Sequence, residues 1–73
     1  MRTLKFHHEV YSGKALDETE VVFKEHAEVA RRQHMPYFEV DLTAKTASDD
    51  EDALAGEFAN YALALTIEER RIG

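Results

Sequence analysis

The chain has 73 residues, no cysteine, and a formal net charge of −6 at pH 7. Its length allows one domain, residues 1–73, that hides only about 60% of its unfolded surface, and the missing cysteines exclude disulfides and thiolate zinc sites. The negative charge disfavours nucleic acid and anionic lipid as partners, and no segment approaches the ~20 apolar residues of a membrane span. The first residues, MRTLKFHHE, lack the apolar core of a signal peptide, so we expect a cytoplasmic protein.

Residues 4–10, LKFHHEV, alternate apolar and polar side chains with a period of two. This alternation predicts a half-buried strand. Its apolar side carries Leu4, Phe6, His8 and Val10. The segment Tyr11-Ser12-Gly13 then breaks the pattern, and Ser12 can cap a following helix.

From about Ala15 the apolar residues change to the spacing of a helix. They are Leu16, Val22, Phe23, Ala27 and Ala30. Two starts are open for this first helix. One is a cap at Ser12, and the other is a weak capping box of the form D-x-x-E, with Asp17 as the cap and Glu20 as its partner.

The end of this helix is ambiguous, because HAEVARRQ, residues 26–33, fits two structures. Good helix formers dominate the segment, which favours a helix that continues to His34. The alternation within the segment also permits a short strand over residues 26–32. Pro36 disfavours helical backbone geometry in the residue before it and so marks the end of either element.

On the helical interpretation, the charges of this segment have simple roles. Arg31 and Arg32 lie near the end of the helix, where carbonyl groups attract cations. Glu28 and Arg32 are four residues apart, the spacing of a helix-surface ion pair worth about 0.3–0.5 kcal/mol. We interpret the other basic pair, Arg70 and Arg71, in the same way, as charges at the end of a second helix.

Residues 37–44, YFEVDLTA, alternate cleanly and predict another strand. After a loop, Ser48 and Glu51 form a capping box of the form S-x-x-E, with acidic residues in the first turn. A helix from about Asp49 to Arg71 follows, and its large apolar residues keep one seam. These residues are Leu54, Phe58, Tyr61 and Leu65.

Together these elements predict an α+β fold in which two helices cover one face of a small sheet. The order is βαβα with two strands, or βαββα with three strands if residues 26–32 form a strand. The predicted core residues are Leu4, Phe6, Val10, Phe38, Val40 and Leu42 in the sheet and Leu16, Val22, Phe23, Leu54, Phe58, Tyr61 and Leu65 in the helices. Because so small a sheet keeps open edges, we expect a homodimer or a complex with another protein or peptide, through a strand edge or the alanine-rich side of the second helix.

Histidines are the main candidates for chemistry. Neighbouring side chains of a strand point to opposite faces, so His7 and His8 should not share a metal ion unless a bulge or turn redirects one of them. His7 should pair across the sheet with Glu39 or Asp41. His8, on the apolar face, is the one functional candidate, although a partly buried histidine that is hydrogen-bonded to a neighbour explains it as well.

No other cluster has the spacing of a known site. His26 and His34 are too far apart on a helix to bind one metal, and the acidic run 49–52 lacks the spaced ligands and glycine of a calcium loop. No nucleotide-binding, nucleophile-elbow or zinc-protease motif occurs. We therefore predict no catalytic residue, no cofactor and no metal site. The expected function is a non-catalytic interaction module, and the alternative is a small ligand-responsive or hydrolytic protein that uses His8.

Three stretches share a family pattern: EVYSGKAL (9–16), YFEVDLTAK (37–45) and EFANYALALTIEERRI (57–72). The pattern is V-Y-S before a helix, then F-x-N-x-x-L followed by charged residues that end in an arginine. The matching residues here are Val10-Tyr11-Ser12, Phe58, Asn60, Leu63 and Arg70. Over nearly its whole length the chain resembles the small HxsD-like proteins of His-Xaa-Ser peptide maturation systems.

This resemblance implies βαββα order, with HAEVARRQ as the first strand of a hairpin. It also implies a non-catalytic accessory encoded beside radical-SAM maturation enzymes, and it carries over no catalytic residue. The helix-favouring character of HAEVARRQ departs from the family pattern.

Overall fold

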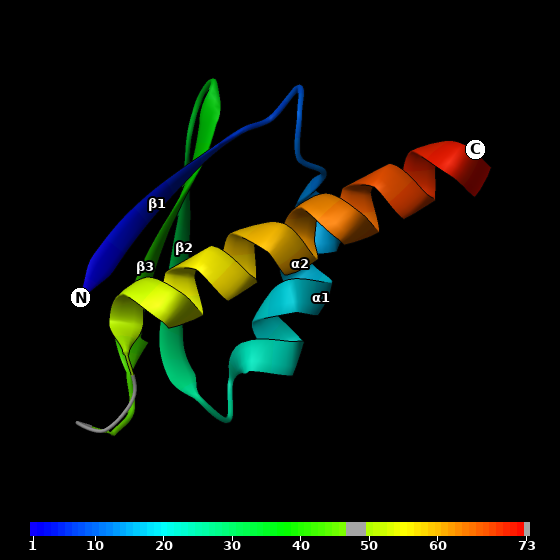
Figure 1. The fold of residues 1–73 in the computed structure, drawn as a ribbon. Helices are drawn as coiled ribbons and strands as arrows, with labels where there is room; N and C mark the ends of the chain where they lie inside the picture. Colours follow the sequence, from blue (N-terminus) through cyan, green and yellow to red (C-terminus); the bar gives the residue numbers. More distant parts are fainter. Residues whose placement is uncertain (47–49, 73) are drawn as a thin grey trace.

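The computed structural model describes residues 1–46 and 50–72. Along the chain the elements are β1 (Arg2–His7), α1 (Gly13–Phe23), β2 (Ala27–His34), β3 (Tyr37–Ala44) and α2 (Glu51–Ile72). Both helices lie on the same side of the sheet, and the other side is left open (Figure 1). The predicted α+β class is confirmed, in its three-stranded βαββα form.

The sheet has the strand order β1-β3-β2, and both pairings are antiparallel. β1 and β2 therefore run in the same direction with β3 inserted between them, an arrangement known as a split βαβ unit. On the side that faces the helices, Leu4 lies opposite Val40 and Val29 lies opposite Leu42. The predicted alternation of residues 37–44 is thus confirmed, and β3 supplies the middle of the sheet.

The favoured helix over residues 26–34 is wrong, because α1 ends at Phe23 and β2 occupies this segment. Side chains on the two faces of β2 have different partners far away in the sequence. Arg31 binds Asp17 of α1, whereas Arg32 binds Asp41 of β3. These tertiary ion pairs favour the strand over the helix propensity of the segment.

Two further predictions fail for the same reason. Arg31 and Arg32 do not lie at a helix end, and the helical ion pair between Glu28 and Arg32 does not form, because both residues belong to β2. Arg70 and Arg71 do lie in the last turn of α2, as predicted.

The predicted first strand is displaced, since β1 ends at His7 and a turn begins at His8. The last contact between β1 and the hairpin is a hydrogen bond from the His8 N–H to the Pro36 carbonyl, 3.0 Å long. Three predicted core residues are in fact substantially exposed: Val10 by 45%, Val22 by 47% and Tyr61 by 39%. Val10 is exposed because it follows the end of the strand and does not share its inner face.

Phe58 of α2 is the centre of the core. It is fully buried, and its ring centroid lies 5.9 Å from that of Phe6 and 5.4 Å from that of Phe23. The buried apolar residues are Phe6, Ala15, Leu16, Phe23, Ala27, Val40, Leu42, Ala55, Phe58 and Ala62. Ala55 and Ala62 belong to this set, so part of the alanine-rich side of α2 is used inside the chain and is not free for a partner.

The two helices begin with different caps. The Ser12 Oγ accepts a hydrogen bond of 2.9 Å from the Ala15 N–H, so α1 begins at Gly13 and the alternative start at Asp17 is wrong. At α2, the Asp50 carboxylate accepts from the N–H groups of Asp52 and Ala53. The predicted capping residue of α2, Ser48, lies outside the described residues, as does Asp49.

The end of α2 holds the turn that precedes α1. The Thr66 Oγ1 accepts a hydrogen bond of 3.3 Å from the Ser12 N–H, and the Ser12 hydroxyl donates to Glu69. Arg70 donates to the carbonyl of Glu9, 2.6 Å away. Hydrogen bonds to residues at the C-terminal end of α2 thus fix the connection between β1 and α1. Among the described residues, no helix is long and apolar enough to cross a membrane.

Replacing Phe58 by alanine should lower the free energy of unfolding by about 3–5 kcal/mol, because it opens a cavity between the rings of Phe6 and Phe23. A chain of this length has about 4–11 kcal/mol in total, so this loss is a large fraction of its stability and should shift the midpoint of urea unfolding to clearly lower concentration. Urea unfolding followed by circular dichroism measures the change. The matched control is Val21→Ala on α1, which is 67% exposed and should change stability by less than about 0.5 kcal/mol. Equal losses in the two variants would contradict this description of the core.

Candidate functional site

The two neighbouring histidines lie at the end of β1. His7 is the last residue of the strand and His8 the first of the turn, and their rings are stacked with centroids 5.2 Å apart. The prediction that the two side chains point to opposite faces is therefore wrong, because the turn redirects His8. Neither histidine lines either of the two hollows that border β2.

The contacts of His7 also differ from the prediction. Its Nδ1 accepts a hydrogen bond of 3.2 Å from the Glu9 N–H, and its ring lies edge-on to Tyr37 at 5.3 Å. The predicted partners, Glu39 and Asp41, instead bind Arg32. His7 thus has local contacts, and no nucleophile is among them.

The acidic residues at the start of α2 also have partners within the chain. Asp50 caps the helix, Glu51 binds the N-terminal ammonium group at 2.8 Å, and Asp52 binds Arg2 at 3.1 Å. Within residues 1–46 and 50–72, no group of three or more histidine, aspartate or glutamate side chains could hold a metal ion.

The open face of the sheet carries a charged cluster centred on Arg32. Its guanidinium group binds Glu39 at 3.1 Å and Asp41 at 2.6 Å, and Asp41 also accepts a hydrogen bond from the Thr3 hydroxyl. The hydrogen bond from Arg32 is the main reason that the pKa of Asp41 is below its ordinary value, and the bond from Thr3 adds to it. The cluster joins all three strands on this face.

The hydrogen-bond pattern of the sheet shows which edge groups are free. The Lys45 N–H donates to the His26 carbonyl, one step beyond the pair formed by Ala27 and Ala44. Hydrogen-bonded and non-bonded pairs alternate in an antiparallel ladder. The even-numbered residues of β2 therefore bond to β3, and its odd-numbered residues direct their N–H and C=O groups outward. The outward residues are Ala27, Val29, Arg31 and Gln33.

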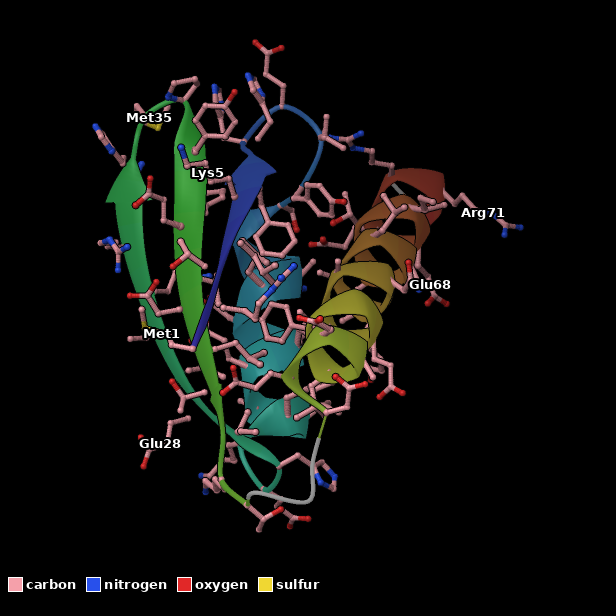
Figure 2. The ribbon with its side chains drawn as sticks, turned by 60° about the vertical axis from the view of Figure 1, so that its left-hand side comes forward. Met1, Lys5, Glu28, Met35, Glu68 and Arg71 are labelled. Atoms are coloured by element: carbon pink, nitrogen blue, oxygen red, sulfur yellow. The ribbon has the colours of Figure 1, made fainter. Side chains whose placement is uncertain are left out.

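This free side of β2 is an exposed border of the molecule (Figure 2). Glu28 marks its beginning and Met35 the hairpin at its end. Ala27 is only 1% exposed, so its main-chain groups are covered within the chain. No hydrogen bond from another described residue reaches the main chain of the other three outward residues, Val29, Arg31 and Gln33. By the same alternation, the outward residues of β1 are Thr3, Lys5 and His7, but the His7 carbonyl already accepts from the N–H groups of Val10 and Tyr11. β2 therefore offers the longer open edge.

Two hollows border β2, one on each face of the sheet. The helix-side hollow, of about 290 Å³, lies between α1 and β2 and is lined by Asp17, Glu20, Val21, Lys24 and Val29. The outer hollow, of about 310 Å³, is lined by Met1, Glu28, Val29, Ala30, Asp41 and Thr43. Val29 lines both, so side chains of an added strand would have room on either face.

Glu20 is the unusual group of the helix-side hollow. Its Oε2 lies 3.3 Å from the Arg31 Nη1 as an ion pair, but this atom is buried and accepts no well-aligned hydrogen bond from a described residue. Burial raises the pKa of Glu20, and the Arg31 charge offsets only part of that rise. The hollow therefore contains a carboxylate that a further hydrogen-bond donor would stabilise.

We refer to the outward main chain of β2 together with the two hollows as the β2 edge. It lacks the chemistry for bond making or breaking, and its free N–H and C=O groups are suited to pairing with an extended segment. The sequence predicts an interface at a strand edge but does not place that edge at β2, because the helix formers in residues 26–34 favour a helix over the alternative strand. The available signal was the alternation in HAEVARRQ just before Pro36.

No family model matches the chain, and no curated protein or solved structure matches it.

Stability should fall in acid partly because Asp41 becomes protonated. Its pKa is lowered in the folded state, so its contribution is complete above the unfolded value of about 3.9 and is lost as the pH falls through the folded value. Asp41→Asn should therefore show a flatter loss of stability than the natural chain between about pH 5 and pH 2, and so should Arg32→Gln. Urea unfolding at a series of pH values tests this.

The control is Glu57→Gln, which removes an exposed carboxylate of α2 that forms no ion pair with a described residue. Its acid profile should keep the slope of the natural chain. An unchanged slope in Asp41→Asn would show that this carboxylate does not contribute to acid lability.

Proposed function

We propose that the chain is a non-catalytic interaction module that binds an extended segment of another polypeptide by strand addition along the β2 edge. The observation that carries this proposal is the row of accessible outward main-chain groups at Val29, Arg31 and Gln33. In strand addition, main-chain hydrogen bonds give affinity, and pockets for alternate side chains give specificity. The β2 edge has both elements.

Magnitudes explain why the hollows matter. Each main-chain hydrogen bond contributes a net of about 0.5–1.5 kcal/mol, whereas association costs about 4–15 kcal/mol in lost freedom of motion. Main-chain pairing over three accessible outward residues would thus barely offset the cost of association. Apolar atoms of the bound segment must also be buried, against Val21 and Val29 in the helix-side hollow and Ala30 in the outer hollow.

The resemblance to HxsD-like proteins suggests the biological system in which the module acts. The βαββα order agrees with what that resemblance implies, and on this basis we place the module in a peptide maturation system as an accessory protein. A radical-SAM enzyme should then be encoded next to this chain. Sequencing the flanking genes checks this, and neighbours without such an enzyme would remove this part of the proposal.

Selection from a phage-displayed library of random 12-residue peptides tests the binding edge directly. Recovered peptides should bind the isolated chain in extended form and shift the amide resonances of β2 in nuclear magnetic resonance spectra. Amide exchange should slow at Val29, Arg31 and Gln33, because only outward N–H groups gain a new partner.

Gln33→Pro gives the sharpest variant. It removes an outward N–H and no hydrogen bond to β3, and proline is tolerated on edge strands, so the fold should persist while peptide affinity falls at least about 10-fold. The matched control, Gln33→Ala, keeps the N–H and should bind like the natural chain. Equal binding by the two variants would exclude strand addition at the β2 edge.

A further inference from the structure

We propose that the segment that pairs with the β2 edge is β2 of a second copy of this chain, antiparallel to the first about a two-fold axis at Ala30. This inference rests on the proposed function and names the partner for the same edge. Pairing would join two three-stranded sheets into one continuous sheet. In such an isologous interface each contact occurs twice, so the edge must be complementary to itself.

The outward groups restrict how two β2 strands can pair. Only odd-numbered residues have free N–H and C=O groups, so odd residues must face odd residues across the interface. An axis at Ala30 satisfies this requirement. Val29 then faces Arg31 of the second copy, and Arg31 faces its Val29, so the accessible outward groups at the centre of the edge pair with each other.

Charge selects this register among its neighbours. With the axis at Ala30, Glu28 faces Arg32 of the second copy, and the symmetry repeats this pair. An axis at Arg31 would place two arginines directly opposite each other, which is destabilising. An axis at Val29 would bring Glu28 opposite the uncharged Ala30. Only the Ala30 register of these three brings opposite charges together without a like-charged pair.

Both members of the charge pair are available for it. Glu28 is exposed and forms no ion pair with a described residue. Arg32 donates three hydrogen bonds to Glu39 and Asp41. Because a guanidinium group has five N–H donors, Arg32 keeps donors for a carboxylate of the second copy.

The space around Ala30 also fits a second strand. The small Ala30 side chain lines the outer hollow, so two copies can approach closely at the axis. On the helix side, Arg31 of the second copy would lie beside Val29 at the helix-side hollow. Glu20 Oε2 is buried there without a hydrogen bond from a described residue. Each Arg31 donates one hydrogen bond to Gly13 and one to Asp17 of its own chain, and because a guanidinium has five N–H donors it keeps donors for Glu20 of the other copy.

Single cysteines test the register, because the natural chain contains none. Facing residues of a non-hydrogen-bonded pair have Cα atoms about 4.5 Å apart, within the roughly 4.4–6.8 Å that a disulfide spans. With oxidised glutathione, Ala30→Cys should therefore form disulfide-linked dimers, at least about 10-fold faster than Glu57→Cys, an exposed control on α2.

Two more variants check that residue 28 of one copy faces residue 32 of the other. Glu28→Cys alone and Arg32→Cys alone should cross-link slowly, because each cysteine lies about 13 Å from its own copy across the axis, four residues at about 3.3 Å each. An equimolar mixture of the two should cross-link rapidly, because residue 28 of one copy faces residue 32 of the other. Cross-linking that is no faster in the mixture than in the single variants would overturn the register.

Sedimentation equilibrium provides the independent readout. The natural chain should approach twice its 8.4 kDa monomer mass at high micromolar concentration. Glu28→Arg should weaken the dimer at least about 10-fold, because it places an arginine opposite Arg32 of the other copy at both ends of the interface. A monomer at millimolar concentration would overturn the inference, and so would a dimer that Glu28→Arg leaves unchanged. If library peptides still bind the β2 edge in either case, the proposed function stands and only the identity of the partner fails.

Discussion

The pairing of β3 on both of its sides is the constraint on which the whole structure depends. β1 and β2 contact each other only through β3, and α2 packs against β3, β1 and α1. The inner residues of β3, Val40 and Leu42, are fully buried beneath Phe58. β3 can fill this position because apolar and polar residues alternate along its whole length. The apolar side chains therefore face the helices, and the carboxylates of Glu39 and Asp41 face outward. The acidic outer side then holds Arg32 of β2.

The pattern of apolar residues predicts each element that has a buried face. The pattern correctly predicts residues 37–44 and places α2 within two residues, since Phe58 and Val40 mark faces that must leave water. For α1 it predicts the start at the Ser12 cap as one of two alternatives, but the predicted end at His34 lies 11 residues beyond Phe23. β2 gave a weaker signal, because most of its side chains are exposed and only Ala27 is fully buried. What makes the segment a strand is its ion pairs with α1 and β3, and these depend on residues far away in the sequence.

The candidate site was harder to predict than the fold, for a physical reason. Histidines attract notice in a sequence because their side chains can titrate, bind metals and transfer protons. The β2 edge consists of main-chain groups that every residue except proline carries, so no residue type marks it. It becomes visible only when the strand order and the phase of the ladder are known. Lys45 and His26 fix that phase through one hydrogen bond outside the strands.

The contacts between Ser12 and the end of α2 have a consequence for synthesis on the ribosome. The hydrogen bonds from Ser12 span 54 and 57 positions, and the bond from Arg70 to Glu9 spans 61. A growing chain that ends at the hairpin does not yet contain Thr66, Glu69 and Arg70. The connection between β1 and α1 therefore lacks the hydrogen bonds from α2 that fix it in the folded protein. Until α2 has been synthesised and has packed, the strand edges of the chain are exposed. Neighbouring nascent chains can then pair with these edges incorrectly.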